Sequence, residues 1–257
     1  MKVVGVIPAR YGSTRFPGKP LAPILGRPMI QWVCERAAKV RGLERLIVAT
    51  DDERIVDAVR AFGGEAVLTS PGCASGSDRV WEAVKGSSCD VVLNLQGDEP
   101  ALEPSGVQAL LELMERDQEA GLGTLVTPLD RRQEYENPNV VKTVLSDSGR
   151  CLYFSRSPVP YLRGKAFGET PLWRHVGVYA FRRPILEAFV GWPRGPLEAA
   201  EELEQLRALE HGVFIAAAVT RWPGCAVDTP DDILAAEAYL SSHLPCSSLP
   251  TPHSSLP

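Results

Sequence analysis

The feature that most constrains the fold of this chain is a regular alternation of short apolar runs with helical segments over its first half. Continuous apolar runs predict buried strands at residues 3–7, 46–49, 66–68, 91–95 and 124–127. Apolar spacing and capping signals predict helices between them, at 28–40, 51–62, from 75 onward and at 105–116. Strands that alternate with helices are joined by right-handed crossovers, so we expect an α/β fold with a mostly parallel central sheet flanked by helices.

The pattern changes after residue 128, where strands are predicted at 140–145, 152–154 and 176–181 with few helices between them. We interpret 130–212 as a smaller β-rich inserted subdomain that follows an α/β core at 1–129. A Glu-rich helix at 197–209, a return strand at 213–219 and a closing helix at 229–240 follow. The last two elements return the chain to the core over 213–243. The tail at 244–257 is rich in Ser, Pro and Leu, which predicts disorder.

Composition excludes several classes of protein. The formal charge is −5, and Lys and Arg form no basic cluster of the kind that binds nucleic acid. No apolar run approaches the roughly twenty residues that cross a bilayer. The start of the chain is broken too early, at Pro8, for a signal peptide. The six cysteines are scattered without a Cys-x-x-Cys pair, so we expect a reduced cytoplasmic protein without disulfides or zinc.

The loop after the first strand is dense in cations. Arg10, Arg15 and Lys19 lie within ten consecutive positions, in a turn that also contains Gly12 and Gly18. Backbone N–H groups in such a turn bind phosphate oxygens, and Arg adds bidentate contacts. The spacing is not that of a P-loop, which needs four residues between its glycines and a Ser or Thr after the Lys. The position favours phosphate binding over a merely solvated basic loop.

Two carboxylates are candidates for a metal site. Asp98 follows the most apolar strand, at the edge of the sheet where the cationic loop also emerges. Asp228 precedes Thr229 and Pro230, which are predicted to cap and begin the closing helix. Mg²⁺ takes one or two carboxylates together with substrate phosphates. A plain turn at Asp98 and a second capping acid at Asp228 are the alternatives.

Four further polar residues have weak local signals. Arg156 and His175 lie near strands of the region 130–212, where such residues are more often structural than functional. Glu204 and Gln205 lie on the Glu-rich helix, whose polar residues would ordinarily face solvent. No Ser-His-Asp or Cys-His signature is present, so covalent catalysis is not indicated.

Taken together, these segments resemble the 3-deoxy-manno-octulosonate cytidylyltransferases, also called CMP-Kdo synthetases, from about residue 3 to 240. The resemblance is carried, in this order, by IPARYGSTRFPGKP (7–20), SGSDR (75–79), NLQGDEP (94–100), NPNVVK (137–142), YFSR (153–156), RHVGVY (174–179), LEQLR (203–207) and VDTP (227–230). The first and third segments recur more loosely among sugar nucleotidyltransferases in general. The combination is specific to the family.

The resemblance implies a fold of the nucleotide-diphospho-sugar transferase type and a homodimer, with 1–129 binding nucleotide and 130–212 binding sugar and forming the dimer. Nucleotide would be bound by Ala9, Arg10, Ser13, Arg15, Lys19, Ser75, Gly76 and Arg79. Magnesium would be bound by Asp98 and Asp228, and the sugar by Gln96, Arg156, His175, Glu204 and Gln205. The catalytic set would be Lys19, Arg15, Asp98 and Asp228.

The implied reaction joins CMP from CTP to the anomeric hydroxyl of 3-deoxy-manno-octulosonate, for lipopolysaccharide biosynthesis. Arg156 is the expected partner of the sugar carboxylate, because its fork matches that group. The chain departs from the family pattern at 197–201 and between 160 and 173, so an amino variant of the sugar stays an alternative substrate. Sialic acid and a non-catalytic nucleotide-sensing role are the further alternatives.

Overall fold

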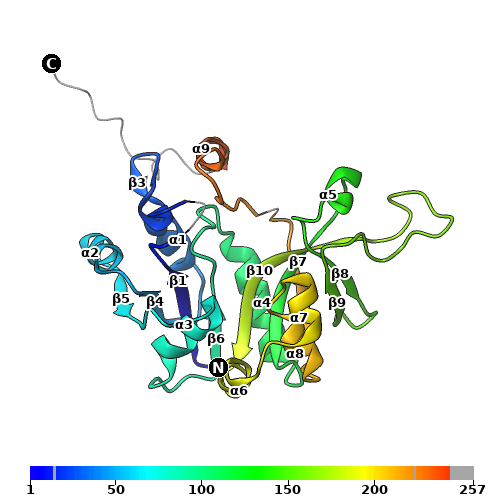
Figure 1. The fold of residues 1–257 in the computed structure, drawn as a ribbon, viewed down its shortest axis with the longest axis horizontal. Coiled ribbons are helices and arrows are strands. Elements are labelled where there is room, and N and C mark those ends of the chain that lie inside the picture. Colours follow the sequence, from blue (N-terminus) through cyan, green and yellow to red (C-terminus); the bar gives the residue numbers. More distant parts are fainter. Residues whose placement is uncertain (14–15, 223, 244–257) are drawn as a thin grey trace.

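The structure is a computed structural model that describes residues 1–13, 16–222 and 224–243. Figure 1 shows a central sheet with helices packed on both sides. The strands are β1 (Val3–Ala9), β2 (Pro23–Ile24), β3 (Arg27–Pro28), β4 (Leu43–Thr50), β5 (Glu65–Leu68), β6 (Val91–Asn94), β7 (Leu122–Pro128), β8 (Lys142–Leu145), β9 (Cys151–Ser155), β10 (Trp173–Arg182) and β11 (Ile215–Val219). The helices are α1 (Met29–Ala37), α2 (Glu53–Ala61), α3 (Gly76–Val84), α4 (Pro104–Arg116), α5 (Arg132–Glu136), α6 (Arg183–Gly191), α7 (Pro196–Glu201), α8 (Leu206–Glu210) and α9 (Asp232–His243), with a 3-10 helix η1 (Lys19–Leu21). Arg15 and the tail at 244–257 lie outside the described residues.

The sheet confirms the predicted α/β architecture. Its strand order is β11-β7-β10-β6-β1-β4-β5, with the β8–β9 hairpin attached to β10. The pairs β6–β1, β1–β4, β4–β5 and β7–β11 are parallel. Strand β10 runs antiparallel to both of its neighbours, β6 and β7. The region 130–212 therefore supplies a central strand of the sheet as well as the hairpin at its side.

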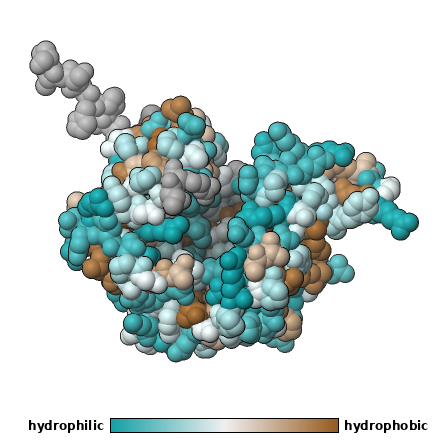
Figure 2. All heavy atoms as spheres, in the orientation of Figure 1, coloured by the Kyte–Doolittle hydropathy of each residue, from teal (hydrophilic) through white to brown (hydrophobic). Residues whose placement is uncertain are grey.

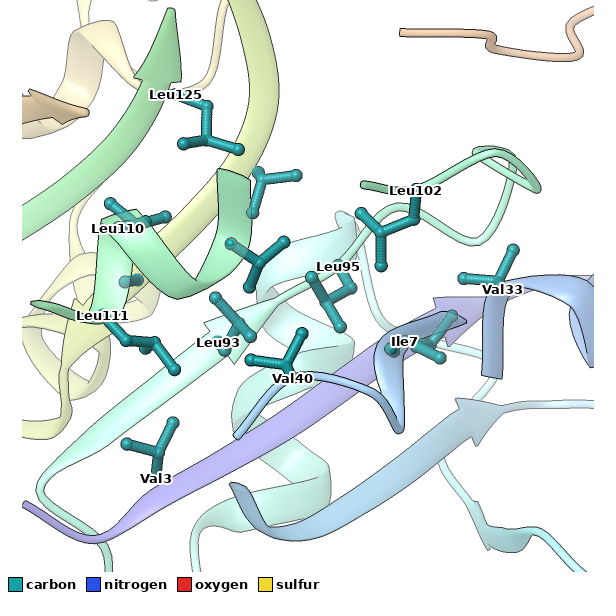
Figure 3. Packing of buried hydrophobic residues seen from close by; sticks show 14 of the residues in the cluster. Val3, Ile7, Val33, Val40, Leu93, Leu95, Leu102, Leu110, Leu111 and Leu125 are labelled. Carbon is teal, nitrogen blue, oxygen red and sulfur yellow. The ribbon is translucent and has the colours of Figure 1, made fainter. Parts of the chain in front are cut away.

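The core lies on both faces of the sheet, as the continuous apolar strands predicted. On one face, Leu93 and Ile7 pack with residues of α1 and α4, and Figure 3 shows this packing. On the other face, Val6 and Val92 pack with residues of α3 and α6. Leu93 is fully buried, and replacing a buried Leu by Ala typically costs about 2–5 kcal/mol of unfolding free energy.

Helix starts follow local capping rules where those rules were strong. Ser75 and Asp78 form the predicted capping box at the start of α3, each accepting the other's backbone N–H. The Asp52 carboxylate caps α2 by accepting the N–H of Arg54. Among the described residues, no helix is both long enough and apolar enough to cross a membrane.

Two helix predictions were wrong. The single helix expected at 197–209 is two short helices, α7 and α8, because Glu202 adopts the left-handed conformation with φ 52°. The closing helix begins at Asp232, three residues later than expected. The Thr229 hydroxyl donates to Oδ2 of Asp232 at 2.9 Å, so it does not act as the predicted backbone cap.

Candidate active site

The loops after β1 and β6 form one side of a cleft at the carboxyl edge of the sheet. Val6 is the register partner of Asn94, so the two parallel strands leave the sheet together. The cleft holds a cavity of about 470 Å³. It is lined by Pro8, Ala9, Arg10, Ser13, Lys19, Pro20, Cys73, Ala74, Ser75, Gly76, Arg79, Gln96, Gly97, Asp98 and Asp228. The structure thus brings together every predicted nucleotide and metal residue that it describes.

The two loops touch through a glycine. A Cβ atom on Gly97 would lie 2.8 Å from the carbonyl oxygen of Pro8, which is closer than real Cβ contacts allow. Gly97 therefore permits the close backbone approach that brings Asp98 to the first loop. The molecular face in Figure 2 is mostly hydrophilic, with its hydrophobic side chains in small separate groups.

Lys19 joins the two candidate metal carboxylates. Its Nζ lies 2.8 Å from Oδ2 of Asp98 and 3.5 Å from Oδ1 of Asp228. Gly18, which precedes it, has φ 72°, a conformation that favours glycine. One cation is therefore already held between two carboxylates that come from distant parts of the chain.

The same carboxylates fit magnesium. Both present hard oxygen ligands to the cavity, and the Lys19 ammonium shows that a positive group is accommodated between them. Within the described part of the chain, no cluster of three or more His, Cys, Asp or Glu side chains forms a closed metal cage. Two carboxylates that face a cavity are a donor set that Mg²⁺ accepts, because it binds through one or two carboxylates and completes its shell with substrate phosphates and water.

Arg79 links three elements at the wall of the cleft. Its guanidinium donates to Oγ1 of Thr69 at 2.6 Å and to Oδ2 of Asp51 at 2.8 Å. These residues follow β5 and β4, so Arg79 ties the ends of two strands to α3. Because the side chain is only 5% exposed and already paired, it shapes the wall of the cleft as well as lining it.

Gln205 is buried and Glu204 is half-buried beside the cleft, contrary to the solvated face expected from the sequence. The Ser77 hydroxyl donates to Oε2 of Glu204 at 2.9 Å, and the Tyr179 hydroxyl donates to Oε1 of Gln205 at 3.1 Å. Burial raises the pKa of Glu204. Nε2 of Gln205 and Oδ1 of Asn94 are buried without a hydrogen-bond partner, and Oε1 of Glu204 makes only an ion pair with Nη2 of Arg207 at 3.8 Å. Such orphaned polar atoms are rare in folded proteins and point to a bound polar molecule.

His175 lies within this polar layer on β10. Its Nε2 is 2.9 Å from Oγ1 of Thr124, whose own hydrogen is directed at the carbonyl oxygen of Val178, also at 2.9 Å. We therefore assign the hydrogen to Nε2, which donates to Thr124. Burial, with a smaller contribution from Arg174, lowers the pKa of His175 to about 3. The imidazole is neutral near pH 7, and Nδ1 is then an acceptor.

The polar layer adjoins the cleft at two points. Gln96 lines the cavity and lies against β10, where a Cβ on Gly177 would be 3.7 Å from its Cγ. Ser77, the partner of Glu204, follows Ser75 and Gly76 of the lining. The cavity lining includes Gln96 but none of His175, Glu204 and Gln205.

Arg156 is placed differently from the other predicted sugar residues. Its guanidinium donates to the backbone carbonyls of Glu201 at 2.8 Å, Pro138 at 3.1 Å and Glu202 at 3.4 Å. It does not line the described cavity. These contacts cap the end of α7 and hold the break before Glu204.

Glu99 was missed by the sequence reasoning. It follows Asp98 directly, and its Oε2 accepts the backbone N–H of Cys225 at 2.7 Å. Burial, together with the nearby Asp98 charge, raises the pKa of Glu99 to about 7. The motif NLQGDEP presents two adjacent acids, and no local signal separates the one facing the cavity from the one facing the protein.

A parallel-sheet cleft with paired carboxylates, basic residues and a capped helix defines a nucleotide-binding enzyme. Residues 4–215 match the family model described as "Cytidylyltransferase". The chain belongs to the cytidylyltransferase family.

The chain is similar to the 3-deoxy-manno-octulosonate cytidylyltransferase of Syntrophobacter fumaroxidans, with 48% identity over 94% of this chain and 98% of the relative. It is 46% identical to the 8-amino-3,8-dideoxy-manno-octulosonate cytidylyltransferase of Shewanella sediminis, over 94% of this chain and 99% of that one. The solved structure of CMP:2-keto-3-deoxy-manno-octonic acid synthetase complexed with CTP superposes with a TM-score of 0.90 at 42% identity, covering 95% of this chain and 100% of that one.

Proposed function

We propose that this chain transfers CMP from CTP to 3-deoxy-D-manno-octulosonate, giving CMP-3-deoxy-D-manno-octulosonate and pyrophosphate, for lipopolysaccharide biosynthesis. The observation that carries the proposal is the cleft in which one ammonium lies 2.8 Å from Asp98 and 3.5 Å from Asp228. It is supported by similarity, at 48% identity over nearly the whole chain, to a relative named for this activity.

The reaction forms one bond and breaks one. The anomeric hydroxyl oxygen attacks the α-phosphorus of CTP, the α–β phosphoanhydride bond breaks, pyrophosphate leaves, and the hydroxyl proton is released. Two polyanions must meet, so positioning and charge neutralisation supply most of the catalysis.

The residues of the first loop and of the metal site have distinct roles in this proposal. Arg10 and Ser13 line the cavity and would bind the CTP phosphates. Lys19 would donate to the departing pyrophosphate, where a fixed donor counts most. Asp98 and Asp228 would hold magnesium, which would supply positive charge beside the phosphate groups and lower the pKa of the attacking hydroxyl. Arg15 stays a predicted partner of the pyrophosphate.

The sugar would lie over the buried polar layer. Its hydroxyl groups offer an acceptor for the unpaired Nε2 of Gln205 and a donor for Oε1 of Glu204, which lies 3.8 Å from Nη2 of Arg207. Gln96 lies between this layer and the nucleotide cleft, and neutral His175 offers Nδ1. We retain Arg156 as the candidate for the sugar carboxylate, a role that requires it to exchange a carbonyl partner for the ligand.

A second candidate substrate is the 8-amino form of the sugar acid, because a relative named for it is 46% identical over 94% of the chain. The Glu204 carboxylate is compatible with either form, since it accepts from a hydroxyl or from an ammonium group. A competition assay with the two sugars at equal concentration measures the ratio of their kcat/KM values and decides between them.

The test of the reaction is pyrophosphate release from CTP and Mg²⁺, with and without the sugar. We expect sugar-dependent release that Asp98→Asn reduces by at least about a hundredfold. Glu65→Gln is the matched control, because Glu65 is an exposed carboxylate at the start of β5 that pairs with Arg45. Folded protein that binds CTP but releases no pyrophosphate with either sugar would exclude the proposal and favour another sugar acid or a sensing role.

Two further parts of the proposal concern the state of the protein. We propose a homodimer, which light scattering coupled to size-exclusion chromatography measures directly. We also propose a cytoplasmic location, because Cys34, Cys73, Cys89, Cys151 and Cys225 all have free thiols in the structure. Fractionation of cells that express the tagged chain tests the location.

A further inference from the structure

The segment that carries Asp228 has no regular secondary structure over its described residues, 220–222 and 224–231. It runs between the end of β11 at Val219 and the start of α9 at Asp232, and it crosses the carboxyl edge of the sheet. An irregular segment reaches a defined position only if contacts from elsewhere hold it. The position of Asp228 beside Asp98 therefore depends on the contacts that hold this segment in place.

The N–H of Asp228 donates to Oδ2 of Asp232 at 2.9 Å, within the segment. Two further hydrogen bonds join the segment to the loop after β6. The N–H of Val227 donates to the backbone carbonyl of Asp98 at 2.9 Å. The N–H of Cys225 donates to the carboxylate of Glu99 at 2.7 Å. The loop that presents one metal carboxylate thus also holds the segment that presents the other.

The Glu99 carboxylate is also in close contact with Gly224. Gly224 has φ 74°, and a Cβ there would lie 3.3 Å from Oε1 of Glu99 and 3.2 Å from Nη2 of Arg174. The chain therefore turns at Gly224 directly against the ends of both side chains. The contact leaves little room for the segment to shift without moving Glu99.

We infer that Glu99 is a positioning residue that fixes Asp228 next to Asp98 through the N–H of Cys225, and so builds the divalent-metal site. This inference rests on the proposed function, in which those two carboxylates bind the metal. Glu99 acts through the backbone and is not itself a ligand. An acceptor oxygen at its position is what the role requires, whatever its charge.

The inference predicts a definite order among three variants. Glu99→Ala removes the acceptor, and Mn²⁺ affinity in the presence of CTP should fall about 10- to 100-fold, the usual effect of losing a group that orients a metal ligand. Glu99→Asp retracts the acceptor by one methylene and should lie between Ala and wild type. Glu99→Gln keeps an oxygen for the N–H of Cys225 and should stay within about threefold of wild type.

The experiment is a Mn²⁺ titration followed by electron paramagnetic resonance, with CTP present, alongside pyrophosphate-release kinetics. Asp117→Asn is the matched control, because Asp117 also accepts backbone N–H groups, from Glu119 and Ala120, at the end of α4. Glu99→Ala should lower kcat and raise the Mg²⁺ requirement while the KM for the sugar changes less than twofold. Circular dichroism checks that each variant is folded.

Two results overturn the inference. If Glu99→Ala binds Mn²⁺ as tightly as wild type, Glu99 does not position the site. If Glu99→Gln is as weak as Glu99→Ala, the charge matters and Glu99 is a ligand or an electrostatic partner. If Glu99→Ala does not fold, the comparison of Glu99→Asp with Glu99→Gln still decides. Failure of the proposed function is recognised separately, because wild-type protein then shows no turnover whichever residue stands at 99.

Discussion

Replacing Lys19 by Met should change metal binding and turnover in opposite directions. In the structure, the Lys19 ammonium occupies the space between Asp98 and Asp228, at 2.8 Å and 3.5 Å. A divalent cation that binds both carboxylates must displace that ammonium. Without the ammonium, the cation meets no competitor, so its affinity in the absence of CTP should rise.

The size of the effect follows from the exposure of the three groups. The side chains of Lys19, Asp98 and Asp228 are 16%, 29% and 47% exposed, so solvent weakens the interaction, especially at Asp228. A charge-assisted hydrogen bond in such a setting is worth about 1–2 kcal/mol. Removing it should therefore raise Mn²⁺ affinity about 5- to 30-fold. Turnover should fall about 100- to 1,000-fold, because the donor to the departing pyrophosphate is lost.

The assay is the same Mn²⁺ titration by electron paramagnetic resonance, without and with CTP, on Lys19→Met and wild-type protein. Lys39→Met is the control, because Lys39 is an exposed lysine that does not line the cleft. Unchanged or weaker Mn²⁺ binding by Lys19→Met without CTP would refute the competition argument. Unchanged kcat would remove Lys19 from the catalytic set.

Three further predictions test other parts of the site. Gly97→Ala should lower kcat/KM for CTP at least about tenfold, because the added Cβ would lie 2.8 Å from the carbonyl oxygen of Pro8. If steady-state kinetics give the wild-type kcat/KM, the close approach of the two loops does not matter for CTP. Arg156→Lys should raise the KM for the sugar more than that for CTP, and a selective effect on CTP would refute its assignment to the sugar carboxylate. The pKa of His175 is about 3 in the folded protein against 6.5 ordinarily, so the unfolded state binds more protons between these values. The free energy of unfolding should therefore decrease as the pH is lowered from about 6.5 to 4, by at most about 1.4 kcal/mol per pH unit. Urea titrations at several pH values measure this slope, and His175→Gln should flatten it.

The parts of the fold that depend on local rules were predictable. A capping box at Ser75 and Asp78 is closed by neighbours three positions apart, and it is present. Parallel strands joined by helices end at one edge, so the loops carrying Lys19 and Asp98 had to emerge there together. The cleft could therefore be placed before any distance was known, and the distance of 2.8 Å between those two side chains confirms the placement.

The position of β10 was not predictable in the same way. Its apolar run predicts a strand, but a run of apolar residues says nothing about which strands lie beside it. Strand β10 pairs antiparallel with β6 and β7, which precede it by dozens of residues. Such pairing is decided by the whole sheet, because each added strand covers an edge that would otherwise be left unpaired.

Glu204 and Gln205 show most clearly why local reasoning fails at a functional site. Every residue from 197 to 209 is compatible with a helix, and in a continuous helix the polar ones would face water. The break at Glu202 is held instead by Arg156, which directly follows β9 some 45 positions earlier and donates to the carbonyls of Glu201 and Glu202. Once the chain turns there, Glu204 and Gln205 enter the polar layer beside the cleft, and Nε2 of Gln205 and Oδ1 of Asn94 in that layer have no hydrogen-bond partner. A fold that leaves such atoms unpaired loses stability unless a ligand satisfies them, so the departure from helical propensity and the candidate sugar site have the same structural cause.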